Sequence, residues 1–383
     1  MHRSRQLGAV AIAIATLLAV TAGVASATTS AVIGHVYVNN NTVANTISGF
    51  DRHADGSLSP IAGTPFAAGG AGRGTPTGSA GALQLSADGR YLLAVDAASN
   101  QISVLRIAAD GSLRLVDLTS SRGTTPLSIA VHGRLVYVAN GGAGGSNYTG
   151  FRLNPDGQLR AIRNSTVALP DDAHPGQVLF SPDGRHLAGT RVGPDAGPSF
   201  IDSFAVRTDG RLIAAPGSPF AAQGVGAFGS EFRPTNANQL FVSNAHNGPG
   251  NGTVSAYDVA KNGVLTPVAR SPFADNQTAP CWVEISHEGA YLFAINTAVP
   301  SISRYSIAAG GALTLLGSTP FNSPSGLRPF DARLDPTGHF LYVVDAGAAK
   351  ISAFAVDGGA LTELASSPFS IPGGGAPFGI VVN

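Results

Sequence analysis

The sequence has few of the residues that point to disulfide bonds, nucleic-acid binding or disorder. Cys281 is the only cysteine among 383 residues, so the chain has no internal disulfide and its stability must come from packing. Only 12% of the residues are charged and the formal net charge is zero, which excludes the basic stripe of a nucleic-acid-binding protein. With 44% hydrophobic residues and 49 glycines, the composition favours a turn-rich all-β protein over a disordered chain.

Residues 1–27 have the pattern of a secretory signal peptide. Arg3 and Arg5 precede an apolar stretch from Leu7 to Val20, and Ala25-Ser26-Ala27 has the small residues of a cleavage site. The apolar stretch is shorter than the roughly 20 residues of a membrane span. No lipobox cysteine lies at the cleavage point. We therefore expect a secreted, extracellular protein cleaved after Ala27, with residues 28–383 as one domain that contains no membrane span.

The stretch from Pro329 to Phe369 predicts four short strands. Runs rich in Val, Ile, Phe, Tyr and Leu (FDARL, FLYVV, ISAFAV and LTEL) are separated by turns such as DPTG and DGG, and no apolar residues recur at helical spacing. A single four-stranded sheet of about 40 residues cannot bury both of its faces. The stretch therefore needs neighbouring sheets of the same kind.

The same unit recurs along the chain. Its second turn carries a glycine at intervals of 46–55 residues: Gly56, Gly111, Gly157, Gly210, Gly263, Gly311 and Gly359. A Pro-Phe pair follows the last predicted strand of five copies, at Pro65, Pro219, Pro272, Pro320 and Pro368. Several independent markers in phase indicate a repeat of seven sheets.

The two ends of the chain predict how the repeat closes. The first copy opens with GHVYVNN and lacks a preceding innermost strand, whereas Phe378–Val382 at the C-terminus matches the opening strands of other copies. A linear array would instead need polar caps at its ends. We therefore predict an all-β, seven-bladed β-propeller of four-stranded antiparallel blades, with the C-terminal strand pairing beside Val36–Asn39.

Four glycine-rich segments fall between the predicted strands. Residues 67–81 have no phosphate-binding spacing and are expected to form a plain surface loop. Residues 141–150, 193–199 and 244–252 lengthen the same connection, between the second and third strands, in blades three, four and five. We expect these three insertions to lie on one rim of the disc, where propellers usually carry their function.

The unit with its SPDGRHL turn, its xGxL turns and its trailing SPF resembles the seven-bladed propeller lactonase family. This family includes 6-phosphogluconolactonase-type enzymes and the fungal carboxy-muconate cyclases, and the resemblance covers about residues 31–383. It implies lactone hydrolysis without a cofactor, by a His, Arg and Glu set on blades four to six that faces one mouth of the channel.

Compared with the family pattern HPHSVVFSPDGRFLFVPDLGADR, most of these catalytic positions are substituted. The first His is retained as His174. The remaining positions carry Gly176 for the second His, Ala196 for the closing Arg, Phe228-Gly229 for an Arg-His pair, Ala245 for a Glu and Thr297 for an Arg. Because these side chains cannot activate water or hold an oxyanion, an active enzyme must use other residues.

Other polar residues are therefore candidates for the site. The candidate catalytic residues are His174, Arg191, Glu231 and Glu284, and the candidate substrate-binding residues are Asp195, His246, Asp331 and Arg333. Glu231, Glu284 and Arg333 share one position with Gln84 and Leu179, five residues before the first turn of their blades, on the innermost strand. A charged group there must pair or face channel water, so a structural ion pair is the competing interpretation.

Arg191 belongs to a second set of positions, the polar residues that end each second strand. The others are Asn39, Asp96, Asn140, Asn244, Asn296 and Asp345. Asn and Asp often end strands by bonding to nearby backbone, so a structural role is expected for the set, and Arg191 is the one basic member. No His or Cys spacing predicts a metal site, and Cys281 is expected to be buried and inert.

Two functions remain open. The first is a secreted lactonase, 6-phosphogluconolactonase-like in family, that opens a sugar-derived or other small lactone. Phosphorylated sugars are not expected as substrates outside the cytoplasm. The second is a non-catalytic binding propeller whose rim loops contact a glycan, a peptide or a cell-surface partner. In either case we expect a monomer with no bound cofactor.

Overall fold

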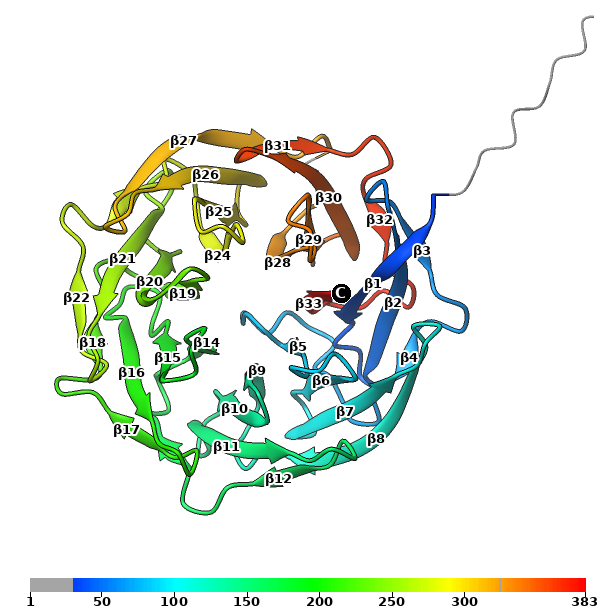
Figure 1. Cartoon of the computed structure of the whole chain (residues 1–383), viewed down its shortest axis with the longest axis horizontal. Coiled ribbons are helices and arrows are strands. Elements are labelled where there is room, and N and C mark those ends of the chain that lie inside the picture. Colours follow the sequence, from blue (N-terminus) through cyan, green and yellow to red (C-terminus); the bar gives the residue numbers. More distant parts are fainter. Residues whose placement is uncertain (1–29, 324) are drawn as a thin grey trace, which may run out of the picture.

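The structure, a computed structural model, describes residues 30–323 and 325–383, so the signal-peptide prediction lies outside the described residues. The described residues form seven antiparallel sheets in a ring around a central channel (Figure 1), which confirms the predicted seven-bladed propeller. Within these ranges no helix has the length and apolar character needed to cross a bilayer.

Each blade has four strands, which follow one another from the channel outward. Blade one contains β33 (Phe378–Val382), β1 (Val32–Asn39), β2 (Thr46–His53) and β3 (Leu58–Pro60). Blade two contains β5 (Leu83–Leu85), β6 (Tyr91–Asp96), β7 (Gln101–Ile107) and β8 (Leu113–Ser120). Blade three contains β9 (Pro126–His132), β10 (Leu135–Asn140), β11 (Asn147–Leu153) and β12 (Leu159–Ala161). Blade four contains β14 (Pro175–Phe180), β15 (His186–Arg191), β16 (Phe200–Val206) and β17 (Leu212–Ala214).

The remaining three blades follow the same order. Blade five contains β19 (Ala227–Arg233), β20 (Asn236–Asn244), β21 (Thr253–Val259) and β22 (Leu265–Pro267). Blade six contains β24 (Pro280–Ile285), β25 (Tyr291–Asn296), β26 (Ser301–Ile307) and β27 (Leu313–Pro320). Blade seven contains β28 (Pro329–Leu334), β29 (Phe340–Asp345), β30 (Lys350–Asp357) and β31 (Ala360–Glu363).

In five blades a two-residue strand pairs with the start of the third strand: β4 (Phe66–Ala67), β13 (Val167–Ala168), β18 (Phe220–Ala221), β23 (Phe273–Ala274) and β32 (Phe369–Ser370). Four of these begin at the phenylalanine of the Pro-Phe marker, after a cis proline. Blade six differs, because Pro320 ends the unbroken β27 and Phe321 is buried in the core. The marker therefore has two structural roles.

The repeated turn glycines fix each blade against the preceding one. All seven have φ between 77° and 89°, a left-handed conformation that favours glycine. At Gly56 a Cβ would lie 2.4 Å from the ring of Phe340 in blade seven, so there is no room for a side chain. The Tyr342 hydroxyl, also in blade seven, donates a 2.9 Å hydrogen bond to the Gly56 carbonyl. The turn of blade one is thus docked on blade seven.

The C-terminal strand closes the ring as the sequence predicts. β33 pairs antiparallel with β1, with Tyr37 opposite Val381 and Val36 opposite Val382. Arg52 of β2 secures this end, because its Nε and Nη2 donate to the carbonyl of Asn383 at 3.1 and 2.9 Å. Its Nη1 lies 3.0 Å from the buried carboxylate of Asp335 in blade seven. One guanidinium therefore joins the first blade, the closing strand and the last blade.

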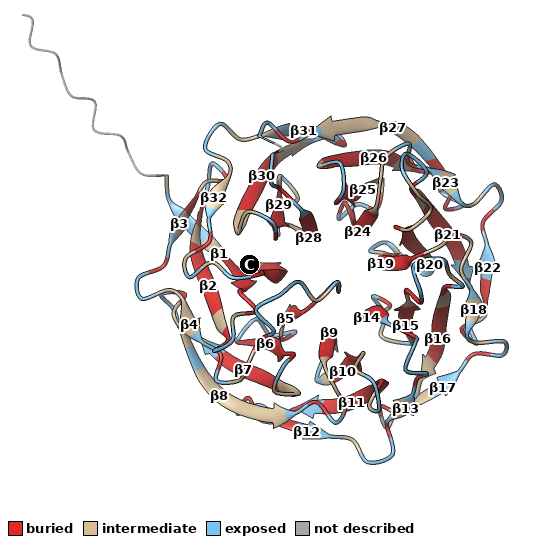
Figure 2. Cartoon of the chain, turned by 180° about the vertical axis from the view of Figure 1, so that it is seen from behind, coloured by how far each residue is buried: buried red, intermediate tan, exposed pale blue. Residues whose placement is uncertain are grey.

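The glycine-rich segment 67–81 is not a plain surface loop, and that expectation is wrong. Its end turns into the channel, where Ser79 and Ala80 are fully buried (Figure 2). The Ala80 N–H donates to the Gly176 carbonyl, and the Gly81 carbonyl accepts from the Ile129 N–H, both at 2.9 Å. These bonds to blades three and four, which the sequence pattern does not show, fix the segment across the channel. We call Ser79–Ala82 the plug.

Replacing Arg52 by methionine tests the closure. Arg52→Met keeps most of the side-chain volume but leaves the buried Asp335 carboxylate and the Asn383 carbonyl without these donors. We expect a loss of about 3–5 kcal/mol in the free energy of unfolding, measured by urea denaturation. Arg185→Met, which removes an exposed ion pair with Asp183, is the matched control and should cost below about 0.5 kcal/mol. Equal losses in the two variants would contradict a clamp at Arg52.

Candidate functional site

The channel has two ends, separated by the plug. Each innermost strand runs from one face of the disc to the other; β14, for example, begins at Pro175 on one face and ends at Phe180 on the opposite face. At about 3.3 Å per residue these two positions are about 17 Å apart. The plug contacts this strand at Gly176, next to its mouth end. The two ends are therefore separate sites.

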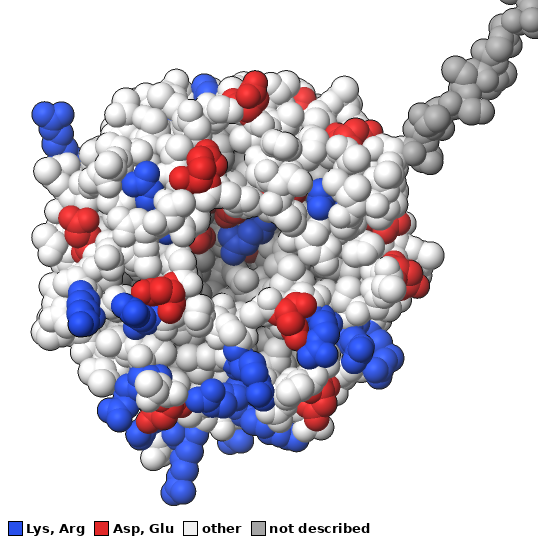
Figure 3. Space-filling view, in the orientation of Figure 1, with Lys and Arg blue, Asp and Glu red and all other residues white. Residues whose placement is uncertain are grey.

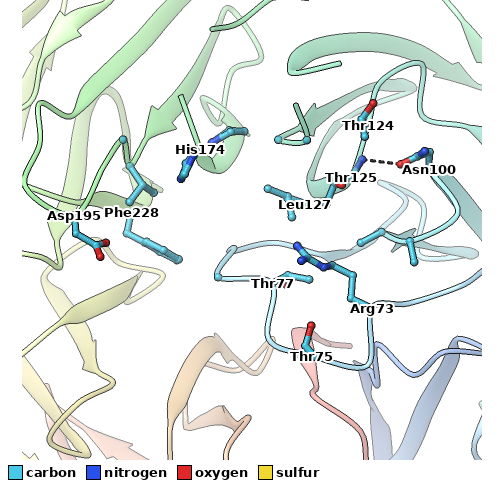
Figure 4. A pocket seen from close by; sticks show the side chains of 18 of the residues that line it. Arg73, Thr75, Thr77, Asn100, Thr124, Thr125, Leu127, His174, Asp195 and Phe228 are labelled. Carbon is cyan, nitrogen blue, oxygen red and sulfur yellow. Dashed lines mark hydrogen bonds between the residues drawn. The ribbon is translucent and has the colours of Figure 1, made fainter. Parts of the chain in front are cut away.

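The face that carries the connections between second and third strands has the larger cavity, which we call the mouth cavity (Figure 4). Its volume is about 870 Å³, and its wall includes Gly141, Asp195 and His246 from the three insertions. The prediction that these insertions share one rim is confirmed. The first is shorter than expected, because residues 147–150 belong to β11 and only 141–146 form a loop.

Polar side chains from six segments of the chain line the mouth cavity. Arg73 reaches in from the segment that ends in the plug, opposite His174 (Figure 4). His246 has its Nδ1 3.5 Å from Oδ1 of Asp195, an ion-pair contact longer than a hydrogen bond. Hydroxyl and amide groups complete the polar wall, from Thr75, Thr77, Asn100, Thr124 and Thr125. The cavity combines a cation, two imidazoles and several groups that can bind hydroxyls.

An apolar wall faces these groups, formed by Leu127, Pro175, Val192 and Phe228. Of the positions that the sequence predicts to be substituted, Phe228 lies in this apolar wall and Gly176 accepts a hydrogen bond from the plug. Throughout the described residues, no three His, Cys, Asp or Glu side chains are grouped so that they could hold a metal ion. The ionisable groups that line the mouth cavity are its two imidazoles, its carboxylate and Arg73.

The opposite face has a smaller cavity of about 160 Å³, which we call the far compartment. Gln84, Leu179, Glu231 and Arg333 line it, so the shared position five residues before the first turn does form one ring in the channel. Glu284, the fifth member, bonds to Arg333 at 2.8 Å through Oε2. The structure thus brings together three of the candidate charged residues, but at the end of the channel away from His174.

Glu284 forms a structural ion pair with Arg333, as the competing interpretation predicts. Besides Arg333, its Oε1 accepts from the Leu334 N–H at 3.1 Å, and its Oε2 lies 3.5 Å from the indole nitrogen of Trp282. The Arg333 guanidinium lies over the Trp282 ring, 4.6 Å from its centroid. With its oxygens occupied by these donors, Glu284 is poorly placed to act as a base.

Arg191 is brought together with none of the other candidates. Its guanidinium makes two 2.6 Å hydrogen bonds to Asp202 of β16, and the Tyr148 hydroxyl donates to the same carboxylate at 3.0 Å. Other blades have serine at the place of Asp202, bonded to the polar residue that ends the second strand: Ser103 with Asp96, Ser255 with Asn244, Ser303 with Asn296 and Ser352 with Asp345. Arg191 and Asp202 thus form a charged version of a structural pair.

Asp331 lies beneath the plug rather than in either cavity. Its carboxylate accepts a 3.2 Å hydrogen bond from the Gly81 N–H, and it is 2% exposed. Burial raises the pKa of Asp331 to about 7, although Arg333 and the N–H groups of Gly81 and Gly379 oppose the rise. Gly379 is part of the closing strand, so Asp331 links the plug to that strand.

Cys281 is buried, as the sequence predicts, and burial raises the pKa of its thiol to about 11. A thiol that stays protonated at neutral pH is a poor nucleophile.

Some lining residues could not be identified from the repeat. Arg73 and Thr77 lie in the segment expected to be a surface loop, and Asn100 and Thr125 lie in ordinary connections of blades two and three. A signal for Arg73 was that it is the one cation in a long glycine-rich segment between repeats. In the far compartment, Gln177 has no charge that would distinguish it from its neighbours in the sequence.

The chain belongs to the lactonase family of seven-bladed β-propellers. The model of this family, described as "Lactonase, 7-bladed beta-propeller", matches residues 33–171 and 231–377, well over half of the chain. The unmatched interval, 172–230, holds blade four, with His174, Arg191 and Asp195. A search of curated proteins gave no match.

Solved structures share the fold at low sequence identity. A candidate 6-phosphogluconolactonase from Bacteroides uniformis aligns with a TM-score of 0.73 and 20% identity, over 91% of this chain and 99% of that one. A periplasmic gluconolactonase from Pseudomonas aeruginosa aligns with a TM-score of 0.69 and 18% identity, over 91% and 98%. A selenium-binding protein from Sulfolobus tokodaii, described as hypothetical, aligns with a TM-score of 0.63 and 10% identity, over 91% and 93%. At these identities the likeness shows the fold alone.

The raised pKa of Asp331 predicts how stability depends on pH. Because the folded state holds this proton more tightly than the unfolded state, folding is favoured at low pH and loses stability as pH rises from about 4 towards 7. The slope is at most about 1.4 kcal/mol per pH unit. Asp331→Asn cannot ionise and should flatten this part of the profile, measured by urea denaturation across the range.

Asp172→Asn, at an exposed position, is the control and should follow the wild-type profile. Burial also raises the pKa of Asp345, to about 7, so some slope should remain in Asp331→Asn. A profile for Asp331→Asn parallel to that of the wild type would show that Asp331 is ionised in the folded protein throughout.

Proposed function

We propose that this protein is a secreted lactonase that hydrolyses a small, sugar-derived lactone in the mouth cavity. The observation that carries the proposal is the His246–Asp195 pair in a hydroxyl-rich cavity of about 870 Å³ that Arg73 also lines. This assignment moves the catalytic role from Glu231 and Glu284 to His246. Membership of the lactonase family and the likeness to a protein described as a gluconolactonase support the reaction class.

In the proposed reaction His246 is the general base. Asp195 beside Nδ1 favours the tautomer with the proton on that nitrogen, which leaves Nε2 free to accept a proton from water. The hydroxide attacks the lactone carbonyl, and the positive charge of Arg73 stabilises the oxyanion. When the ring C–O bond breaks, the imidazolium returns its proton to the leaving alkoxide. The product is the open hydroxy acid, and no other reagent is consumed.

The wall of the mouth cavity favours a neutral sugar lactone over a phosphorylated one. Arg73 is the only Lys or Arg among the described residues that line it, and phosphate recognition usually draws on more than one cation or on several N–H donors. Thr75, Thr77 and Thr125 suit the hydroxyls of a sugar, and Phe228 and Val192 suit its apolar ring faces. The substitutions in blade four and at Phe228 then adapt the family site to a different lactone.

Asp195→Asn provides the cleanest test of this proposal, because the Asp195 side chain is fully exposed and its replacement cannot unfold the protein. With glucono-δ-lactone and a panel of neutral lactones, we expect His246→Ala to lower kcat by about 10²-fold or more. Asp195→Asn should lower kcat by at least about tenfold, and Arg73→Gln by about 10²-fold.

His287→Ala, an exposed histidine outside the mouth cavity, is the control and should keep the wild-type rate. Hydrolysis by the wild type no faster than in buffer, across the panel, would exclude the lactonase proposal. Activity that survives His246→Ala would move the base to His174.

A second candidate is a binding propeller, favoured by one observation: the 3.5 Å separation of His246 and Asp195 is longer than a catalytic hydrogen bond. In this case the mouth cavity binds a glycan or peptide without chemistry. Replacing residues 141–146 by a two-residue turn should then remove binding on a glycan or peptide array, while Arg185→Met on the opposite face should keep it. Binding that survives the shortened loop would count against this alternative.

A further inference from the structure

The far compartment has no part in the proposed hydrolysis, yet its polar groups are arranged as in a binding site. It lies at the centre of the face shown in Figure 3, which is hollowed there and has basic and acidic side chains in the hollow. The plug lies between it and the mouth cavity, where Ala80 is bonded to blade four and Gly81 to blade three. The two cavities share no lining residue, so the compartment is treated as a site of its own.

Gln177 is the strongest sign of a missing ligand. Its side chain is 2% exposed and lines the compartment, and its Oε1 accepts from the N–H and hydroxyl of Ser230 at 2.5 and 3.2 Å. These two bonds fix the orientation of the amide. Over residues 30–323 and 325–383, no acceptor lies within hydrogen-bond distance of its Nε2. The Nε2 group is open to the cavity, so a ligand or a water there can accept from it.

Two further donors face the same space. Arg333 uses Nη1 for Glu284, whereas its Nε and Nη2 donate to no acceptor in the described part of the chain. Stacking on Trp282 holds the guanidinium plane in place. The Gln84 amide also lines the compartment and makes no hydrogen bond to a described residue. The guanidinium edge and the two amides therefore offer several unengaged N–H donors to the compartment.

Glu231 is the one acidic group that lines the compartment. Its carboxyl accepts no hydrogen bond from the described residues, and its Oε2 lies 3.9 Å from Nη1 of Arg333. Burial raises the pKa of Glu231 to about 8; Arg333 opposes this rise and Glu284 adds to it. At neutral pH the group is therefore mainly a neutral acid that can donate a proton to a ligand oxygen.

We propose that the far compartment is a second binding site, which takes a small carboxylate between the free edge of Arg333 and the amides of Gln177 and Gln84. A carboxylate offers two acceptor oxygens in one plane, which matches the two-donor edge of a guanidinium. The wall that faces the compartment is mainly polar, which suits a small carboxylate with little apolar surface. The volume of about 160 Å³ holds about five waters, and so an acid of about three to five carbons.

The charges around the compartment favour a carboxylate ligand over a cationic one. Glu284 is neutralised by its bond to Arg333, and Asp331 faces the plug, so no free carboxylate remains for an ammonium while Glu231 is protonated. The same groups set the pH dependence. When Glu231 ionises above about pH 8 it repels a bound carboxylate, so affinity should fall by up to about tenfold per pH unit.

The test is calorimetric titration of the whole mature protein with butyrate at about pH 7, beside butyramide and butylammonium as neutral and cationic probes of the same size. We expect saturable binding of butyrate alone. Gln84→Leu removes one donor and should weaken butyrate binding by about tenfold. Glu231→Gln cannot ionise and should keep binding above pH 8, where the wild type loses it.

Arg73→Gln is the control for the other end of the channel and should bind butyrate as the wild type does. Three results would overturn the proposal: no saturable butyrate binding, equal binding of butyramide or butylammonium, or loss of binding in Arg73→Gln with retention in Gln84→Leu. None of these results depends on whether the mouth cavity hydrolyses a lactone.

Discussion

Closure of the ring by β33 is the constraint on which the rest of the structure depends. Each blade can bury its two faces only against two neighbours, so an open array would expose a face at each end. In this protein the C-terminal strand completes the first blade, and Arg52 ties it to Asp335 of the last blade. The turn glycine of each blade then docks on the preceding blade, as Gly56 does on Phe340. Closure therefore fixes the width of the channel.

The plug extends this constraint into the channel. Gly81 is held by Ile129 of blade three and by Asp331 of blade seven, and the N–H of Gly379 in the closing strand helps to oppose the rise in the pKa of Asp331. The plug thus depends on the same strand that closes the ring. Because the blades surround it on all sides, the segment can be buried although it is rich in glycine, with its backbone groups satisfied by the innermost strands. The result is a channel with a separate cavity at each end.

The sequence was sufficient for the fold and for part of the site. Repeated glycines and the match of Phe378–Val382 to other opening strands predicted seven blades and their closure, because these features are local in sequence or periodic. The shared position of Gln84, Glu231 and Arg333 was also predicted, since equivalent residues of equivalent strands lie at one level of the channel. The division of the candidate residues between the mouth cavity and the far compartment was not predictable from the register alone. It depends on which end of a strand each residue occupies, and on the position of the plug.

Arg191 shows why a departure from a repeat is weak support for function. As the one basic residue among seven equivalent positions it was a candidate, yet Asp202 provides its partner from the adjacent strand. A change at one position of a buried pair requires a matching change at its partner position. A comparison of one equivalent position across the seven blades cannot detect the change at the partner position. A functional departure lacks such a partner inside the blade. Gln177 and Glu231 meet this condition in the far compartment, since the Nε2 of the first donates to no described residue and the carboxyl of the second accepts no bond from one.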